Sequence, residues 1–265
     1  MVASFPFNAR ANGFSIENAY CLAKLSELTY EDEAAKVIAT GQSWGFAKDR
    51  CVFYNRGDTQ AFIFHDDEKI LVAFRGTEPT HLEDWMSDAK IRKTAAPGGN
   101  VHRGFYGALM LVWHDMEQWL EGARRPEQSL WITGHSLGAA LAALATASLL
   151  FSEAAPRVNG LYTYGQPRCG SEPWAAAFNM RFKAQAFRVV NNNDVVTRVP
   201  PSNLNYSHIG QLKYIDADGR MHSDGDLSWW ARFWDRVEGR LADFGHVGPD
   251  GIRDHSIATY APMPT

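Results

Sequence analysis

The sequence predicts an α/β fold in which helices cover both faces of a central, mostly parallel sheet. Two observations lead to this prediction. Short apolar segments rich in β-branched and aromatic residues alternate along the chain with longer segments whose apolar residues recur at helical spacing. The composition, 45% hydrophobic and 21% charged over 265 residues, is that of a folded domain with a sizeable core, and no linker-like or repetitive tract interrupts it. We therefore expect a single α/β domain over residues 1–265.

The first part of the chain predicts two helices and then an antiparallel start to the sheet. In residues 16–40 the apolar side chains recur every three or four positions, as on the buried faces of two amphipathic helices. Three segments rich in strand-forming residues follow at 51–56, 60–66 and 69–76, and the short stretches between them carry turn signals. Strands joined by such short turns are expected to pair antiparallel.

The rest of the chain predicts strands and helices in alternation. Residues 104–119 show a helical repeat of apolar side chains, and the alanine-rich run at 139–151 reads as a buried helix. Short apolar strands, separated by helical segments, are expected at 130–133, 160–165 and 186–191. This alternation is typical of a parallel sheet covered on both faces. A strand at 211–215 and an aromatic-rich helix at 227–241 complete the prediction.

Charge and cysteine usage argue against several classes of function. A formal net charge of -4 provides no basic face for a phosphate backbone, so nucleic acid is not an expected partner. Cys21, Cys51 and Cys169 are widely spaced without a CxxC pair, which favours buried free thiols over a metal or redox site. The first residues lack the basic start and apolar stretch of a signal peptide, and the run at 139–151 is too short to span a bilayer. An unexported, cytoplasmic protein is therefore expected.

Residues 134–138, Gly-His-Ser-Leu-Gly, form a G-x-S-x-G motif between an apolar strand and a long apolar helix. Such a turn pushes a serine hydroxyl out above a sheet, and glycines fit where the strand and the helix cross. The amides that open the helix point toward any oxyanion formed at the serine. The motif predicts an α/β-hydrolase fold with Ser136 as nucleophile, against the alternative of a glycine-rich turn with a spectator serine. His135 is assigned a structural role, because adjacent side chains on so sharp a turn point apart.

A serine hydroxyl needs a histidine to take its proton and an acid to orient that histidine, and in this fold the chain order is Ser, then Asp or Glu, then His. Asp194 follows the strand expected at 186–191, at the carboxyl end of the sheet where loops carry function, and is the best-placed acid. The turn-rich region beyond it holds other acids that are expected to be solvated turn carboxylates, namely Asp216, Asp218, Asp224 and Asp226.

Four histidines lie downstream of this acid, and position alone does not choose between them. His208 lies in the approach to a strand, where packing or hydrogen bonding is expected, and His222 and His246 lie beside charged or glycine-rich loop sequence. His255 opens the last short helical stretch and is the preferred base, while the others stay open.

Several segments resemble the class 3 lipases, the family of filamentous-fungal triacylglycerol lipases and their bacterial and plant relatives. These segments run in the family's order from about Lys69 to the C-terminus. A set of this kind is far more specific than the G-x-S-x-G motif alone. They are Phe74-Arg75-Gly76-Thr77, Asp84-Trp85 with Asp88, Val101-His102-Arg103-Gly104-Phe105, Gly134-His135-Ser136-Leu137-Gly138, Tyr164-Gly165-Gln166-Pro167-Arg168 and Asn193-Asp194.

The resemblance implies a catalytic triad of Ser136, Asp194 and His255, the last matching an Asp-His-Ser near the end of many bacterial members. It also implies an oxyanion hole formed by the backbone amides of Thr77 and Leu137, with the Thr77 hydroxyl as a third donor. A simple strand-end cap is the alternative role for Thr77. This chemistry requires no metal and no organic cofactor. The chain differs from the secreted fungal members in lacking an export signal and an even set of cysteines, which leaves its compartment open.

The segment between Thr77 and Lys90 is where the family carries its lid. Leu82, Trp85 and Met86 share one helical face there, so we expect them to cover the nucleophile in water and to contact a lipid surface on opening. A fixed surface helix packed by its tryptophan is the alternative. The aromatic stripe of residues 227–241 is expected to pack in the core, or else to line an acyl pocket or touch a membrane.

The expected function is hydrolysis of carboxylic esters, and of acylglycerols in particular, with a lipid or small ester as substrate and a lipid interface as a transient partner. Phospholipase A1 and feruloyl or short-chain carboxylesterase activities use the same machinery and stay open. A relative that keeps the fold as a non-catalytic binding module is a further alternative, against which the complete set of triad candidates argues.

Overall fold

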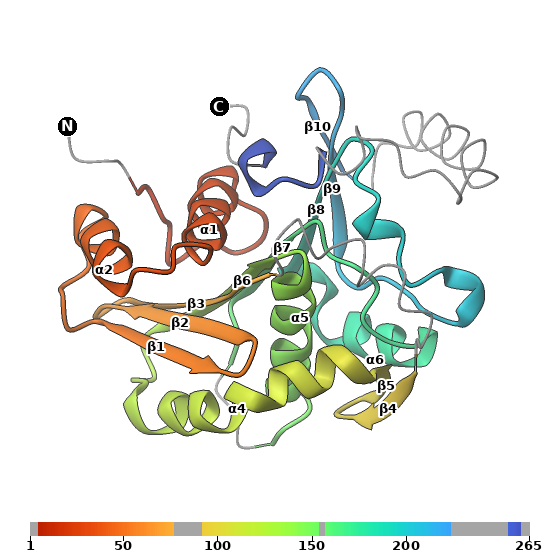
Figure 1. The fold of residues 1–265 in the computed structure, drawn as a ribbon, viewed down its shortest axis with the longest axis horizontal. Coiled ribbons are helices and arrows are strands. Elements are labelled where there is room, and N and C mark those ends of the chain that lie inside the picture. The colour runs from red at the N-terminus through yellow and green to blue at the C-terminus, as the bar shows by residue number, and fades with distance from the viewer. Residues whose placement is uncertain (1–4, 77–91, 154–156, 224–253, 261–265) are drawn as a thin grey trace.

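The structure is a computed structural model of the chain and describes residues 5–76, 92–153, 157–223 and 254–260. Within these residues the architecture is an eight-stranded sheet with helices on both faces (Figure 1). Its strands are β1 (Cys51–Arg56), β2 (Thr59–His65), β3 (Lys69–Phe74), β6 (Ser129–His135), β7 (Gly160–Tyr164), β8 (Ala186–Asn191), β9 (Gln211–Ile215) and β10 (Met221–Ser223).

The strand order is β1-β2-β3-β6-β7-β8-β9-β10. The run from β3 through β6, β7 and β8 to β9 is parallel. Antiparallel pairing is confined to the two ends, where β1, β2 and β3 form a meander and β10 turns back on β9. The predicted mostly parallel sheet with an antiparallel start is therefore confirmed.

The helices cover the two faces in two groups. One group is α1 (Ile16–Leu28) and α2 (Ala34–Ser43), and the other is α4 (Arg103–Ala123), α5 (Leu137–Leu150) and α6 (Glu172–Phe182). Figure 1 shows the first group above the sheet and the second below it. Each group forms a separate buried apolar cluster with its own face of the sheet. The core is thus divided into two layers, as expected for a sheet covered on both sides.

Helix α5 is buried on all sides, and every residue from Gly138 to Leu149 is buried. It packs against β6 and β3 on one side and against α4 on the other. Alanine and glycine allow this close approach because they keep the helix narrow. The prediction of a buried helix at 139–151 is confirmed, and no helix in the described part of the chain has the length and apolar character needed to cross a bilayer.

Two small elements were not predicted. A hairpin of β4 (Lys93–Ala96) and β5 (Gly99–His102) turns at Gly98, whose φ is +85°. The short edge strand β10 follows a turn at Gly219 with φ +78°. Both turns carry glycine signals, but the strands beside them are too short and too polar to show a period-two pattern.

The cysteines differ slightly from expectation. Cys21 and Cys169 are buried free thiols, as predicted, whereas Cys51 is only half-buried. It opens β1, the edge strand of the sheet, where a second neighbouring strand is absent from the described residues. The aromatic helix expected at 227–241 lies outside the described residues and stays a prediction.

Candidate active site

The nucleophile elbow joins β6 to α5 at Ser136. The serine backbone has a φ of 58° and a ψ of -126°, which few non-glycine residues adopt and which is costly unless the surroundings enforce it. Its N–H donates to the carbonyl of Tyr164 at the end of β7 (3.0 Å), so the neighbouring strand holds the turn in place. Because α5 begins at the next residue, the amide of Leu137 lies in its first turn, where N–H groups have no acceptor within the helix. The predicted sharp turn from strand to helix is confirmed.

The two glycines of the motif are required where α5 crosses β6 and β3. A Cβ at Gly134 would come within 3.0 Å of the backbone of Gly138, and a Cβ at Gly138 would come within 3.0 Å of the backbone of Phe74 and Arg75. Real Cβ atoms essentially never show separations this short, and backbone cannot rotate aside as a flexible side chain can. The spacing of the motif therefore follows from the close packing of one helix on two strands.

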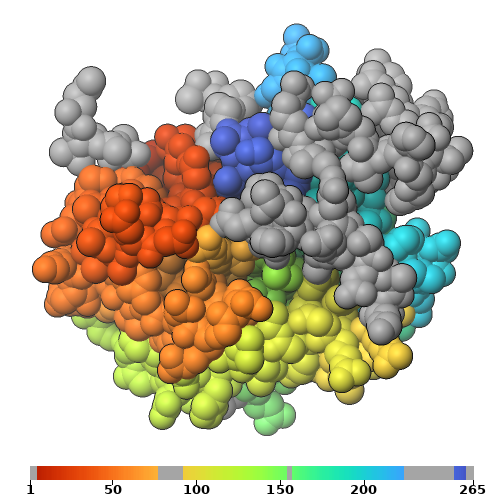
Figure 2. All heavy atoms as spheres, viewed as in Figure 1, coloured from red at the N-terminus to blue at the C-terminus, as the bar shows by residue number. Residues whose placement is uncertain are grey.

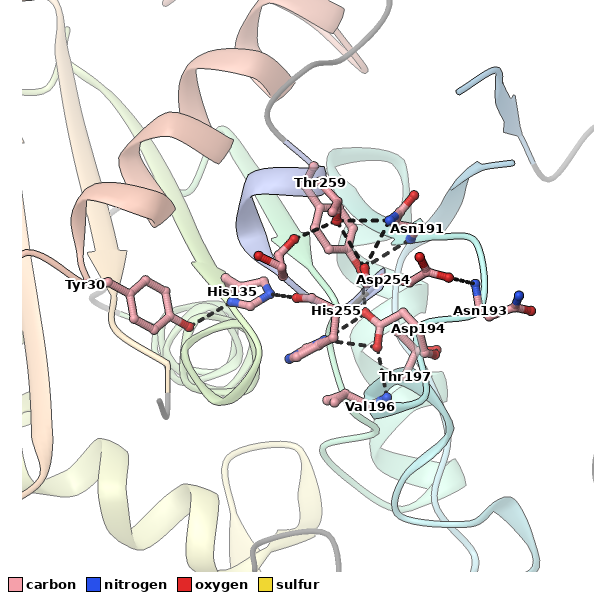
Figure 3. Close-up of polar contacts among 12 residues, drawn as sticks. Tyr30, His135, Asn191, Asn193, Asp194, Val196, Thr197, Asp254, His255 and Thr259 are labelled. Atoms are coloured by element: carbon pink, nitrogen blue, oxygen red, sulfur yellow. Dashed lines mark hydrogen bonds and ion pairs between the residues drawn. The ribbon is translucent and has the colours of Figure 1, made fainter. Parts of the chain in front are cut away.

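His255 and Asp194 form a buried pair close to the elbow (Figure 3). The Nδ1 atom of His255 lies 3.0 and 2.9 Å from the two carboxylate oxygens of Asp194, and the side chains are 2% and 0% exposed. The carboxylate also accepts from the hydroxyl of Tyr260 (2.5 Å) and the N–H of Val196 (2.9 Å). Burial alone would raise the pKa of Asp194, but the charge of His255 and these hydrogen bonds outweigh burial and hold the pKa below its usual value. The carboxylate is therefore ionised at neutral pH and assigns the proton of the histidine ring to Nδ1.

The segment that carries His255 is held by the asparagines at the end of β8 and directly after it. The side-chain amide of Asn191 donates to the carbonyl of Asp254 (3.0 Å). The carboxylate of Asp254 accepts from the side chain of Asn192 (3.0 Å) and from the backbone of Asn193 (3.3 Å), as Figure 3 shows in part. These asparagines lead directly into the acid of the pair, so a single loop fixes both the acid and the segment that bears the base.

Sequence reasoning missed Tyr260 and the role of Asn191, Asn192 and Asn193. A run of three asparagines before an aspartate at a strand end was a visible signal, since amides are suited to satisfying the backbone of an irregular segment. The tyrosine had no comparable signal, because its hydroxyl reaches the carboxylate only after the chain has folded back across the sheet.

Ser136 and His255 are both placed next to Gly165. Gly165 follows the tyrosine whose carbonyl accepts from the serine backbone, and a Cβ added to it would lie 2.7 Å from Cε1 and 2.8 Å from Nδ1 of His255. The serine Oγ and the histidine Nε2 are both buried, and neither has a hydrogen-bond partner among the described residues. With Nδ1 protonated, Nε2 is the basic nitrogen. The two atoms that a nucleophilic serine mechanism needs are therefore committed to no other group in the described structure.

The other histidines that the structure describes in this part of the chain have different partners. His208 Nε2 bonds to the carbonyl of Thr197 (2.9 Å), which confirms the hydrogen-bonding role expected for it. His222 Nε2 lies 2.7 Å from the carboxylate of Asp216 in the β9-β10 hairpin. That carboxylate is only 19% exposed, so Asp216 is not the solvated turn residue that was expected, whereas Asp218 is 73% exposed. The structure thus brings His255 alone of these three to Asp194.

His135 takes the structural role predicted for it, with hydrogen bonds to Tyr30 and to the backbone of His255. No group of three or more His, Cys, Asp or Glu side chains in the described ranges is arranged to hold a metal ion. Several predicted site residues lie outside the described residues and stay predictions: Thr77, Leu82, Trp85, Met86, Asp224, Asp226 and His246.

Comparison with known proteins gives the family. The family model described as lipase (class 3) matches residues 71–204, half of the chain, and this range includes the elbow and Asp194. The chain belongs to the class 3 lipase family. Its sheet, elbow and buried acid–histidine pair are those of an α/β-hydrolase fold, as the resemblance implied.

Among curated class 3 lipases, the Triacylglycerol lipase OBL1 of Arabidopsis thaliana is 29% identical over 255 residues, covering 72% of this chain and 49% of that protein. The Lipase of Rhizomucor miehei is 28% identical, covering 75% of this chain and 55% of that protein. The chain therefore spans about half the length of these relatives.

Solved lipase structures share the fold. The native Rhizomucor miehei lipase propeptide complex has a TM-score of 0.60 at 24% identity and covers 82% of this chain and 76% of its own. A fungal lipase–inhibitor complex has a TM-score of 0.63 at 21% identity and covers 92% of this chain and 94% of its own. At these identities the likeness establishes the α/β-hydrolase fold.

Proposed function

We propose that this chain is a serine ester hydrolase that cleaves acylglycerols through an acyl-enzyme, and that residues 1–265 act as one catalytic domain. The family membership supports the reaction class, and relatives named triacylglycerol lipase or mono- and diacylglycerol lipase support the substrate class. The observation that carries the proposal is the pair of uncommitted buried atoms, Ser136 Oγ and His255 Nε2, beside a carboxylate already bound to the other ring nitrogen.

In the proposed reaction, Ser136 Oγ attacks the ester carbonyl carbon while His255 Nε2 takes the hydroxyl proton. The developing imidazolium is stabilised by ionised Asp194, whose hydrogen bonds from Tyr260 and Val196 keep it in place. His255 then gives the proton to the leaving alcohol as the carbon–oxygen bond breaks. Water repeats the sequence on the acyl-enzyme and releases the acid.

The oxyanion of each tetrahedral intermediate forms next to the N-terminus of α5. The amide of Leu137 and the positive end of the helix dipole are suited to stabilise it there, and one such donor contributes about 3 to 4 kcal/mol to the transition state. Thr77 is proposed as the second donor. Because the amide of Leu137 belongs to a helix that is already formed before substrate binds, it needs no reorganisation during the reaction.

A fluorophosphonate probe tests the nucleophile directly. Wild-type protein is expected to be labelled once, at Ser136, and Ser136→Ala is expected to be unlabelled and inactive on emulsified triacylglycerol. Ser148→Ala is the matched control, because Ser148 is another buried serine whose hydroxyl donates to the carbonyl of Leu144 within α5. Equal labelling of Ser136→Ala and wild type, or hydrolysis that survives the substitution, would refute the proposal.

Substrate profiling tests the acylglycerol assignment separately. Rates on p-nitrophenyl esters from short to long acyl chains, and on triacylglycerol beside phospholipid, are expected to favour longer chains and triacylglycerol. A preference for short or aromatic acyl groups would replace the lipase by an esterase, and a preference for the phospholipid by a phospholipase A1.

A lipid surface is the proposed transient partner. The support is one structural relative, a fungal lipase–inhibitor complex described as a model for interfacial activation in lipases, together with Leu82, Trp85 and Met86 in the predicted lid. The rate on tributyrin is expected to break upward as its concentration crosses the solubility limit. A smooth saturation curve through that limit would exclude interfacial activation.

A further inference from the structure

The ring of His135 lies between Tyr30 and the backbone of His255 (Figure 3). Its Nδ1 atom is 2.8 Å from the hydroxyl of Tyr30, which follows α1, and its Nε2 atom is 2.6 Å from the carbonyl oxygen of His255. The two imidazole rings also pack on each other, with centroids 4.5 Å apart and planes 30° apart. His135 therefore contacts His255 through both its backbone and its ring.

The two hydrogen bonds assign a single tautomer to His135. A carbonyl oxygen can only accept, so Nε2 of His135 must carry a proton and donate to His255. Burial lowers the pKa of His135 to about 3, and the nearby charge of His255 acts in the same direction, so the ring is neutral. Nδ1 then has a lone pair and no proton, and the hydroxyl of Tyr30 is the donor to it.

The position of the His255 ring depends on contacts of this kind, because the residue lies in an irregular segment before the short 3-10 turn Ile257–Thr259. Asn191 at the end of β8 and Asn192 after it hold Asp254 on one side of His255. The carbonyl of His255 itself is held by His135, on the side of the sheet that faces α1. A shift of the carbonyl would carry the attached imidazole away from the serine.

We infer that Tyr30 and His135 are positioning residues, which keep the imidazole of His255 aligned with Ser136. Tyr30 does so by fixing His135 as its Nε2–H tautomer, and His135 by donating to the carbonyl of His255. The inference rests on the proposed function. The titratable groups around His135 are Tyr30, Asp194, His255 and Tyr260. Since a neutral His135 adds no charge to this group, it supports His255 without opposing the imidazolium that forms during proton transfer.

Tyr30→Phe removes the hydroxyl that donates to Nδ1 and keeps the aromatic ring. His135 is then free to carry its proton on Nδ1, which turns an Nε2 lone pair toward the carbonyl of His255 and repels it. We expect kcat on p-nitrophenyl butyrate to fall about tenfold, because the imidazole of His255 is no longer aligned with Ser136. KM should stay within about twofold of wild type, because the substitution does not affect substrate binding. Tyr162→Phe is the matched control, since its hydroxyl accepts from the N–H of Ser15 at the start of α1, whereas Tyr30 follows the end of that helix. It should leave kcat unchanged.

Two substitutions at His135 separate positioning from simple packing. The side-chain amide of His135→Gln reaches the place of Nε2 and can still donate to His255, whereas that of His135→Asn reaches only the place of Nδ1. Both are polar and similar in size, so a packing role would affect both alike. We expect the glutamine variant to retain several times the kcat of the asparagine variant. Equal kcat values for the two would overturn the inference.

Nitrogen NMR of the histidine rings gives a readout that does not depend on activity. In Ser136→Ala protein, His135 is expected to be neutral with its proton on Nε2, and Tyr30→Phe is expected to add the Nδ1–H form. A neutral Nδ1–H ring in the parent, or an active enzyme with unchanged kcat in Tyr30→Phe, would overturn the inference alone. A wild-type protein that is neither labelled by fluorophosphonate nor active on esters would overturn the proposed function and this inference with it.

Discussion

Gly165 lies close to both Asp194 and His255. A Cβ there would lie 2.7 Å from an oxygen of Asp194 and 2.7 Å from Cε1 of His255, and the φ of the residue is +57°. We expect Gly165→Ala to displace the imidazole and to lower kcat about a hundredfold, since misplacement of a reacting group by about 1 Å has effects of this size. Steady-state kinetics on p-nitrophenyl esters measures this loss.

Gly219→Ala is the control for Gly165→Ala. Gly219 also has a positive φ, +78°, but a Cβ there would meet nothing within 4 Å. Its substitution should lower the free energy of unfolding by about 1 to 2 kcal/mol, the cost of the left-handed backbone, with kcat unchanged. If Gly165→Ala behaved in the same way, the ring of His255 would not be sensitive to this contact.

What sequence reasoning could find at single residues depended on how local the signal was. Ser136 could be placed on a sharp turn between strand and helix because the glycines, the strand and the helix that form this turn are its neighbours in sequence. The pairing of Asp194 with His255 spans 61 positions, so local signals favoured His255 without excluding the three other histidines, and the resemblance to a family then assigned it. Tyr260 could not be inferred, since its hydroxyl donates to Asp194 across 66 positions and tyrosine is common in buried cores.

Replacing a glycine by alanine should change the free energy of unfolding in opposite directions in helices α4 and α5. Gly107 lies on an exposed side of α4, where an added Cβ would meet nothing within 4 Å, so Gly107→Ala should raise the free energy of unfolding by about 0.5 to 1 kcal/mol through helix propensity. Gly138→Ala in α5 would press on the backbone of β3 and should lower it by about 1 to 3 kcal/mol or more. Urea unfolding measures both changes, and a stable, fully active Gly138→Ala would contradict the close packing of α5 on β3.

Elements were predictable in proportion to their length and burial. The long apolar helix α5 and the buried strand β6 have composition patterns that few other structures share, and both were found. The β4-β5 hairpin and β10 escaped because their strands are only a few residues long and half-exposed, so pairing with a neighbour, and not burial of a face, defines them.

At the scale of the whole molecule, buried and half-buried histidines make stability depend on pH. Burial lowers the pKa of His102 to about 4 and that of His135 to about 3, and it holds the pKa of His208 well below 6.5. Between pH 6.5 and about pH 4 the unfolded chain therefore binds protons at these positions that the folded chain does not. We expect the free energy of unfolding to fall as pH falls through this window, by up to about 1.4 kcal/mol per pH unit for each histidine. Urea unfolding at a series of pH values tests this.

The contribution of a single histidine to the pH dependence of stability can be measured. His208→Gln keeps a donor for the carbonyl of Thr197 and removes one titrating ring, so the loss of stability per pH unit should be smaller than in wild type. His114→Gln, on the exposed side of α4, serves as the comparison for replacing a histidine that is not buried. A wild-type stability that does not vary between pH 6.5 and pH 4.5 would contradict neutral burial of these rings.

The dependence of the acid–base pair on the asparagine loop and on Tyr260 also sets an order of events during translation. The ribosome completes the serine and the acid well before it adds the base, and the tyrosine that steadies the acid is added later still. Under the proposed mechanism, a nascent chain that already has its sheet and elbow is therefore expected to be inert toward esters. Hydrolysis is expected to begin only after the last of these residues has left the exit tunnel and docked on the asparagines.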